Sequence, residues 1–345
     1  MVRIRKTPSG NVSINDVARI AGVSITTVSR VINKFPSVKE KNRIRVQEAV
    51  KQLKFQPSIF AQRLATGKSN VVALVIPRYE GIFYSYYALE LIRGIGTLCE
   101  ALKLDLLLHL TDSKTVINLK GVGGIIFADF IGNRSQLEDA LDSGTPCIVI
   151  NNYVEDLEVS CIAIDNIRGA EDAVNYLIGL GHKKIAHITG DLVTQAAAWR
   201  FEGYKKALKK NNIEFREAYV FKTDYSRGQA RQAAEKLIKM PERPTAVFVA
   251  SDSMALEVMA VARELGRKIP GDLSIVGFDD NPSGLYGPVS LTTVRQPLVK
   301  MAEESVKELN LLISRKDKSA KKKKILLPTE LVIRESCQPI DAGKA

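Results

Sequence analysis

The residues with the clearest chemical use lie on one short predicted helix, from about Ile25 to Ile32. Helical spacing predicts that it buries Val28, Val31 and Ile32 and exposes Ile25, Thr26, Ser29 and Arg30. An Arg side chain can bond a guanine edge in bidentate fashion, and the hydroxyl and methyl groups of Thr also suit base edges. The exposed face therefore offers chemistry for contacting DNA bases, with a plain phosphate contact as the alternative role of the Arg.

Start and end signals indicate the helices that must position this face. Ser13 followed by Asp16 predicts a capped helix start, and Gly22 predicts the end of that helix. Ser24 can cap the next helix. A third helix is predicted from about Lys39 to Leu53, with apolar residues at Ile44, Val46, Ala49, Val50 and Leu53. Two helices joined by a tight Gly-containing turn form the helix-turn-helix pattern, whose second helix enters the major groove.

Positive charge is concentrated at the same end of the chain. Residues 1–68 contain 14 Lys and Arg against three acidic residues, so they carry +11 of the net charge of +12. This distribution is typical of a protein that binds nucleic-acid phosphates. A solvated basic face or a membrane-surface patch is the alternative. A second basic cluster, 315–324, lies between a helix-like and a strand-like segment, and we interpret it as a solvated loop.

Residues 13–69 resemble the lac repressor/purine repressor family of bacterial transcription regulators, in the run SINDVARIAGVSITTVSRVINKFPSVKEKNRIRVQEAVKQLKFQPSIFAQRLATGKS. The match is dense over more than fifty residues, which makes it specific. The resemblance implies that Ile25, Thr26 and Arg30 contact base edges. Four further polar residues are interpreted as phosphate contacts or helix caps, namely Ser24, Thr27, Ser29 and Asn33.

The segment 57–69 is expected to form a hinge helix and linker. Pro57 suits a first helical turn, and the residues through Ala65 favour helix. A helix this short is marginal in water, so it would need its symmetry mate or DNA as a partner. The resemblance implies that it folds on the operator and that Leu64 wedges into the minor groove. The alternative is a linker helix with Leu64 packed on the core.

From Val71 onward, short apolar runs alternate with amphipathic helices. The runs are 71–77, 104–110, 123–129, 146–151, 161–165, 184–190, 245–251 and 273–280. Continuous β-rich runs of this kind predict parallel sheets buried on both faces, and the length suggests two doubly wound lobes. Further segments, among them WRFEGYKKAL and LTTVRQPL, extend the resemblance over nearly the whole chain. They imply the fold of periplasmic sugar-binding proteins, with the ligand between the lobes.

The expected domain organisation follows from these patterns. We predict an all-α helix-turn-helix domain at 1–56, the hinge at 57–69, and an α/β effector-binding and dimerisation domain at 70–345. Its first lobe is expected at about 70–165 plus 296–323, and its second lobe at about 166–295 plus 324–337.

Matching motifs place the predicted effector site on Arg200, which opens a helix, and on Asp279, which ends a strand. An Arg and an Asp that face each other can hold vicinal hydroxyls through charge-assisted bonds. Ser251 stands where many relatives carry Asn, and Asp252 is predicted to cap the following helix. Further effector candidates are Tyr225, Asn151, Gln296, Phe83 and Tyr84. Their aromatic members could pack as walls or stack on a sugar ring.

The sequence carries none of the usual enzyme signatures. The glycines of GVGGII precede a strand instead of following it, and no GxxxxGK[ST], GxSxG or HExxH motif occurs. His182 resembles a structural turn residue. Four cysteines without a CxxC pair and three histidines give no metal-site spacing, so no metal or other cofactor is expected.

A transport-type solute-binding protein would also fit the second domain, but the basic head and the lack of a signal peptide argue against it. No apolar run approaches the ~20 residues that span a bilayer, so a cytoplasmic protein without membrane contact is expected. The prediction is a ligand-responsive, sequence-specific DNA-binding transcription regulator. We expect a repressor that binds a palindromic operator as a homodimer and takes a sugar or sugar derivative. The C-terminal tail lacks the leucine heptads of a tetramer, and inducer or corepressor logic stays open.

Overall fold

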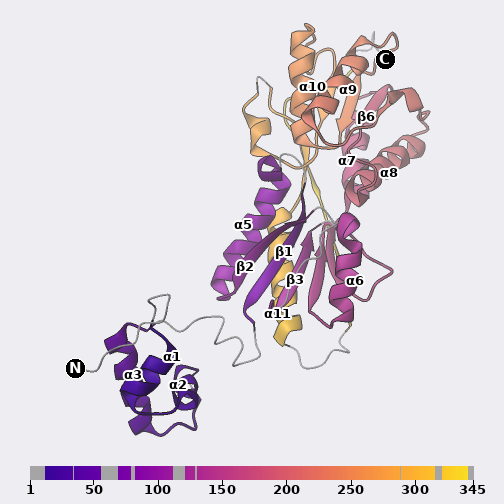
Figure 1. The fold of residues 1–345 in the computed structure, drawn as a ribbon. Coiled ribbons are helices and arrows are strands. Elements are labelled where there is room, and N and C mark those ends of the chain that lie inside the picture. Colours follow the sequence, from indigo (N-terminus) through magenta and orange to yellow (C-terminus); the bar gives the residue numbers. More distant parts are fainter. Residues whose placement is uncertain are drawn as a thin grey trace. The chain divides into compact units, whose positions relative to one another are not determined.

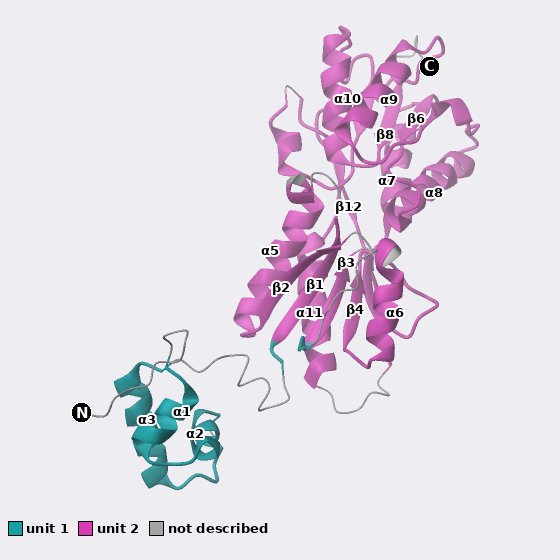
Figure 2. Cartoon of the chain, viewed as in Figure 1, with its two compact units in different colours: residues 1–70, 120–123 teal, residues 71–119, 124–345 magenta. Residues whose placement is uncertain are grey.

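The computed structural model describes residues 12–33, 35–55, 69–78, 82–111, 121–128, 130–287, 289–314 and 321–340. The chain divides into two compact units, residues 1–70 with 120–123 and residues 71–119 with 124–345 (Figure 2). Each unit has its own hydrophobic core. Leu64 and most of the predicted hinge 57–69 lie outside the described residues, so the hinge helix stays a prediction.

The described residues of the first unit hold three helices, α1 (Ile14–Ala21), α2 (Ile25–Ile32) and α3 (Glu40–Leu53) (Figure 1). At the start of α1 the Ser13 hydroxyl accepts the backbone N–H of Asp16, and the Asp16 carboxylate accepts the N–H of Ser13 at 3.1 Å. Gly22 ends α1 with φ of 60°, and Ser24 caps α2 through the N–H of Thr27 at 3.2 Å. These bonds confirm the predicted helix starts and the predicted turn.

The core of the first unit is built on Val17, Val28 and Val46, which are fully buried. Ile44, one of the apolar residues of α3, is 48% exposed. Ile44 lies about 200° around α3 from Val46, so the two residues cannot both face the other helices. Ile32 is half-buried at the edge of the core.

The second unit begins with a lobe around a six-stranded sheet in the order β11-β5-β4-β3-β1-β2, in which all neighbours are parallel. Its strands are β1 (Val71–Pro77), β2 (Asp105–Thr111), β3 (Gly124–Ala128), β4 (Cys147–Ile150), β5 (Ser160–Ile164) and β11 (Lys324–Leu327). Helices α5 (Tyr86–Ala101) and α11 (Leu298–Ser314) pack together against this sheet, and α6 (Arg134–Asp142) contacts β4 (Figure 1).

The place of β11 corrects the predicted lobe boundary, which assigned 324–337 to the second lobe. β11 pairs with β5, from Lys324 opposite Cys161 to Leu327 opposite Ile164. The strand-like run after α11 is two strands, because β12 (Glu330–Val332) leaves the sheet and pairs antiparallel with β10 (Thr293–Arg295). An apolar run can complete either of two sheets, and only backbone pairing with β5 decides which one it joins.

The second lobe is built around a four-stranded parallel sheet in the order β7-β6-β8-β9. Its elements are β6 (Ile185–Ile188), β7 (Val220–Phe221), β8 (Ala246–Val249), β9 (Ser274–Val276), α7 (Asn166–Gly179), α8 (Gln195–Lys210), α9 (Arg227–Lys239) and α10 (Asp252–Glu264). Ile185 packs with α7 and α8, whereas Ala186 and Ile188 pack with α9 and α10. Helices on both faces confirm the predicted doubly wound, parallel architecture.

Two buried histidines of this lobe have structural roles. His182 bonds the hydroxyls of Thr245 at 2.9 Å and Ser274 at 3.1 Å, which confirms it as a structural residue. The Nδ1 atom of His187 bonds the carbonyl oxygen of Phe248 at 2.9 Å, and its ring stacks on the Phe248 ring at 4.7 Å. A carbonyl only accepts, so Nδ1 carries the proton and Nε2 is left buried without a partner.

This environment predicts a pH-dependent stability. Burial lowers the pKa of His187 from 6.5 to about 4. The unfolded chain therefore binds an extra proton between these values, so the contribution of His187 is complete above pH 6.5 and is lost as the pH falls toward 4. We expect His187 to account for a loss of about 3 kcal/mol in unfolding free energy over this range. Urea unfolding followed by Trp199 fluorescence checks this.

The control for this prediction is a pair of matched substitutions. His187→Phe should remove that part of the pH dependence, whereas His109→Phe, at a half-buried position of β2, should keep it. An unchanged pH profile in His187→Phe would show that other groups cause the loss of stability.

Candidate functional site

The first candidate site is the outward face of α2. Val28 and Val31 anchor this helix in the core, and Ile25 is 50% exposed. Thr26 and Arg30 are also exposed, so the structure leaves all three predicted base-contacting residues accessible. Buried residues on one side of a short, capped helix hold its other side in a fixed orientation, as a DNA-contacting helix requires.

The four residues predicted as phosphate contacts or caps make local bonds. The hydroxyls of Ser24 and Thr27 lie 2.9 Å apart, and Ser24 is the N-cap. The amide of Asn33 donates to the Ser29 hydroxyl at 3.4 Å. Capping is thus the confirmed role of Ser24, and contacts to DNA phosphates stay a prediction for all four.

The second candidate site lies in the second unit and is centred on Arg200. The prediction that Arg200 opens its helix is wrong, because α8 begins at Gln195 and Arg200 lies in its second turn. The Arg200 side chain is buried, and its Nε donates to the Asn166 Oδ1 at 2.8 Å. Nη1 donates to the Ala250 carbonyl oxygen at 2.5 Å, and the guanidinium lies 3.7 Å above the ring centroid of Phe278. These contacts hold the cation rigidly.

Asp279 faces this guanidinium, with its Oδ1 at 4.0 Å from Nη1 of Arg200. It lies three residues beyond β9, with φ of 135°, and its backbone N–H donates to the Val294 carbonyl oxygen at 2.8 Å. The carboxylate also accepts a hydrogen bond from the Gln296 side-chain amide. Burial raises the pKa of Asp279, while Arg200 and Gln296 act in the opposite direction. The structure thus brings together three of the predicted effector residues.

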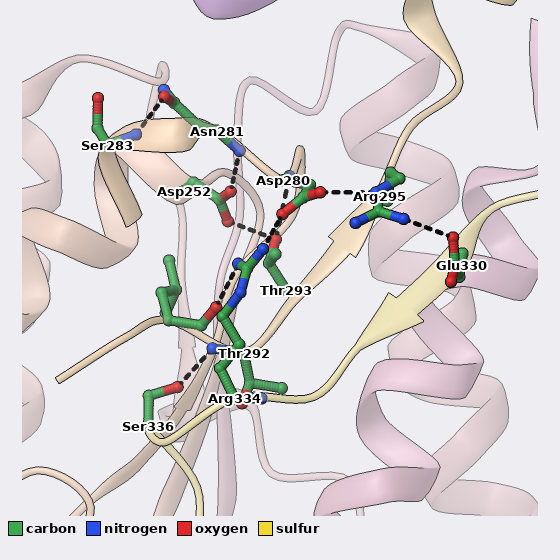
Figure 3. A network of polar contacts seen from close by, with 11 residues as sticks. Asp252, Asp280, Asn281, Ser283, Thr292, Thr293, Arg295, Glu330, Arg334 and Ser336 are labelled. Atoms are coloured by element: carbon green, nitrogen blue, oxygen red, sulfur yellow. Dashed lines mark hydrogen bonds and ion pairs between the residues drawn. The ribbon is translucent and has the colours of Figure 1, made fainter. Parts of the chain in front are cut away.

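The prediction that Asp252 caps the helix is wrong, because Ser251 is the cap. Ser251 caps α10, since its hydroxyl accepts the N–H of Met254 at 3.4 Å. Asp252 is buried and accepts the Thr293 hydroxyl at 2.6 Å and the Asn281 N–H at 2.7 Å (Figure 3). These donors draw its carboxylate away from the helix end. Burial, and then the charge of Asp279, raise the pKa of Asp252.

A network of ion pairs supports the residue that follows Asp279. Asp280, with φ of 60°, accepts Nε of Arg295 at 2.6 Å and Nη2 of Arg334 at 2.5 Å, and Arg295 also pairs with Glu330 at 2.9 Å (Figure 3). Burial works to raise the pKa of Asp280, but the two guanidinium groups outweigh it and lower the pKa. The network attaches the segment after β9 to β10 and to the chain beyond β12.

Sequence reasoning missed the partners that complete this site, namely Asn166, Asp252, Asp280, Arg295 and Arg334. The one local signal in the sequence that could have indicated any of these partners is the pair Asp279 and Asp280, which follows an apolar strand. Each partner lies far along the chain from the group it contacts, so no spacing rule could pair them.

The remaining predicted effector residues lie at other positions. The Tyr225 ring packs against Gly190, where a Cβ would come within 1.9 Å of it, which fits a wall. Asn151 is buried beyond the end of β4, with φ of 66° and no partner for its Oδ1. Phe83, in the short 3-10 helix Ile82–Tyr84, is 56% exposed. The side chain of Tyr84 lies outside the described part of the chain.

Two hydrogen bonds link the loop after β4 to the helix that carries Arg200. The N–H of Tyr153 donates to Gln195 Oε1 at 2.6 Å, and Gln195 Nε2 donates to the Tyr153 carbonyl oxygen at 3.0 Å. The Tyr153 and Trp199 ring centroids lie 6.3 Å apart. The carboxyl end of β4 in the first lobe therefore lies beside the start of α8 in the second.

A helix-turn-helix head and a two-lobed parallel α/β body define a class of DNA-binding regulator, and comparison with known proteins agrees. Residues 13–58 match the family model of bacterial regulatory proteins, lacI family. Residues 174–337 match that of the periplasmic binding protein-like domain. The regulator DegA of Bacillus subtilis is 34% identical over 95% of this chain and 99% of its own length. Catabolite control protein A of Priestia megaterium is 34% identical over 94% and 99%.

Solved structures show the same relationship. The lac repressor dimer bound to operator and the anti-inducer ONPF superposes with a TM-score of 0.81, at 26% identity over 95% of this chain and 99% of that one. The CelR–cellobiose complex gives a TM-score of 0.71 at 27% identity, over 94% and 100%. The chain belongs to the lacI family of bacterial regulatory proteins. It is a DNA-binding transcription regulator and not an enzyme, as the sequence predicted.

Within the described ranges, no group of three His, Cys, Asp or Glu residues is placed to hold a metal ion. None of the helices in those ranges combines the length and apolar character needed to cross a membrane.

Proposed function

We propose that this protein is a repressor that binds a palindromic operator as a homodimer in the cytoplasm and responds to a sugar-like effector held between its lobes. The observation that carries the DNA-binding part is the exposed face of α2, with Thr26 and Arg30 free of the core. Two heads related by a twofold axis would contact two half-sites, which explains a palindromic operator and multiplies a modest single-head affinity.

The effector part of the proposal is supported by the contacts of Arg200, Asp279 and Gln296. Asp279 follows β9 of the parallel sheet, at the strand ends where ligands of this architecture bind. A rigid cation, a carboxylate and an amide can together hold adjacent hydroxyl groups. Related structures contain cellobiose or, in a regulator from Enterococcus faecium, ribose. Effector binding would change the relative position of the lobes and hence the spacing of the two hinge segments.

Selection of operators from random duplex DNA with the full-length protein tests the proposal. We expect a short palindrome to be enriched and its retention to change when one compound of a sugar panel is added. Release from DNA would make that compound an inducer, and tighter binding would make it a corepressor. If repeated selections yield no palindrome, the protein does not act as a sequence-specific dimeric repressor.

A change in the hinge gives a separate prediction. Leu64→Ala should weaken binding to the selected operator by about 1–3 kcal/mol, because the minor-groove wedge that opens a base step would be lost. Leu64→Met, which keeps an apolar wedge of similar volume, should retain most of the affinity. DNA-retardation titration of both variants measures this. Equal affinity of Leu64→Ala and the wild type would show that Leu64 is a packing residue and not a wedge.

A further inference from the structure

We propose that the second lobe carries a second binding site, at the opposite edge of its sheet from Asp279, and that this site takes a small organic anion: a phosphate or carboxylate attached to an apolar body. The site is a cavity of about 440 Å³ where β6 begins, α8 ends and the chain turns toward β7. This volume lies within the ~300–1,000 Å³ range of small-molecule sites. The proposal does not depend on the effector site proposed above.

The sheet separates this cavity from the proposed effector site. The cavity is lined by Ile185, the first residue of β6, and by Thr245, which directly precedes β8. Both residues lie at the amino ends of parallel strands. Asp279, and the Ala250 carbonyl group that Arg200 contacts, lie beyond the carboxyl ends of β9 and β8. A strand of four residues is about 13 Å long, so the two sites are distinct.

The most deeply buried residues of the cavity lining are mainly apolar. Ile185, Leu208 and Tyr219 are 1%, 2% and 4% exposed. The Tyr219 hydroxyl already has a partner, because it donates to the Glu242 carbonyl oxygen at 3.2 Å. Ile340, which is half-buried, extends the apolar surface. The cavity therefore favours a ligand with an apolar part, which would displace water from these side chains.

The charged part of the lining is mainly positive. Lys183, Lys184 and Arg216 line the cavity, together with one acidic residue of the described lining, Glu214. Arg216 is already balanced, since its Nε donates to Glu214 at 3.2 Å and its Nη1 to Glu242 at 2.9 Å. Among the described residues, no acidic side chain pairs with Lys183 or Lys184. These two ammonium groups are the cations available to a ligand.

The end of α8 does not oppose an anion. The carbonyl groups at a helix C-terminus carry a partial negative charge, but Lys209 and Lys210 in the last turn of α8 offset it. Asn212, which is exposed beyond this turn, adds an amide donor to the lining. A phosphate or carboxylate can accept charge-assisted bonds from these groups. A wholly polar anion would leave the apolar lining in water, whereas an anion with an apolar body matches both parts.

Amine labelling of the full-length protein, with and without phenyl phosphate, tests the proposal. Acetylation of Lys183 and Lys184, measured by peptide mass spectrometry, should slow about 10-fold at a phenyl phosphate concentration of about ten times its dissociation constant. Lys268, an exposed lysine of the same lobe outside the cavity lining, should be labelled at an unchanged rate. The wild-type protein is used, so the result does not depend on the folding of a variant.

Matched probes test the two parts of the ligand class. Benzoate carries a carboxylate on the same ring, benzyl alcohol lacks the charge, and inorganic phosphate lacks the apolar body. Phenyl phosphate, benzoate or both should protect the lysine pair, and whichever protects identifies the anionic group. Benzyl alcohol and inorganic phosphate should bind at least about 10-fold more weakly. Protection by neither aromatic anion, or equal protection by benzyl alcohol or by inorganic phosphate, would overturn the proposal.

A pair of double variants tests the two lysines by isothermal titration with phenyl phosphate. Lys183→Gln combined with Lys184→Gln should weaken binding roughly 10- to 100-fold, because charge-assisted bonds are lost. Lys236→Gln combined with Lys268→Gln removes two exposed charges elsewhere in the lobe and should change affinity by less than about 2-fold, since distant exposed charges are screened. Equal weakening by both double variants would show that general attraction, and not this cavity, holds the anion.

The same variants keep this proposal separate from the proposed function. Lys183→Gln combined with Lys184→Gln leaves α2, Arg200 and Asp279 unchanged, so operator selection and the response to a sugar should match those of the wild type. Failure of phenyl phosphate and benzoate to protect the lysine pair would remove the second site only. Failure of the operator selection would remove the repressor proposal and leave the cavity's ligand class untouched.

Discussion

Arg30→Ala is expected to remove most of the discrimination between the selected operator and other DNA. Arg30 is exposed on α2, and the buried Val28 and Val31 leave that helix little freedom to rotate. A bidentate contact to a guanine is worth about 1–3 kcal/mol, or roughly 5- to 150-fold in affinity, and the proposed dimer would lose it in both half-sites. Retardation titrations against the operator and a scrambled duplex, at one fixed salt concentration, measure the effect.

The control for Arg30 is a basic residue of the same unit outside α2. Lys51→Ala removes one exposed positive charge from α3 and should affect operator and scrambled DNA equally. The diagnostic quantity is the ratio of the two affinities. If Arg30→Ala weakens both duplexes by the same factor, Arg30 contacts a phosphate, and base discrimination must come from other residues.

Arg200→Ala is expected to cost the second unit about 3–5 kcal/mol of unfolding free energy, the range typical when one partner of a buried charged pair is removed. The truncation leaves Asp279 buried without its facing cation, and it removes the donors to Asn166 and to the Ala250 carbonyl oxygen. The stacking contact with Phe278 is lost as well. Denaturant unfolding followed by the fluorescence of the single Trp residue reports on this unit.

Two further variants make the result specific. Arg200→Lys keeps the charge but cannot reproduce the donor geometry of the guanidinium, so it should recover only part of the stability. Arg263→Ala, at an exposed position of α10, should change the unfolding free energy by no more than about 0.5 kcal/mol. A loss below about 1 kcal/mol in Arg200→Ala would show that water or a rearranged side chain replaces the missing contacts.

The local signals of the first unit were sufficient to predict its helices. The capping box of Ser13 and Asp16, the turn at Gly22 and the cap at Ser24 all involve residues within a few positions of one another. Interactions of this range depend on the order of residues, so they can be read before the fold is known. The exposure of Ile44 could not be predicted in this way, because the hydrophobic character of a residue does not say which side of α3 faces the other helices.

The second unit shows the same difference between features that local sequence predicts and features that depend on long-range contacts. Continuous apolar runs such as β6, whose four residues are all buried, made the parallel sheets predictable. The lobe that receives β11 was not predictable, because the β11–β5 ladder joins Lys324 to Cys161 across a large separation in sequence. The same holds for Asp252, whose donors Asn281 and Thr293 come from segments that only folding brings beside it.

The sequence by itself determined the class of protein, the basic head, the three helices of the first unit and the residues Arg200, Asp279 and Gln296 as candidates for a ligand. Only the tertiary structure decided how these three side chains are employed: which atoms are already bonded, which are left unpartnered, and how many charges share the site. The physical reason is that local propensity and helix capping act between near neighbours in the chain. Burial, ion pairing and strand exchange depend on contacts between residues far apart in sequence.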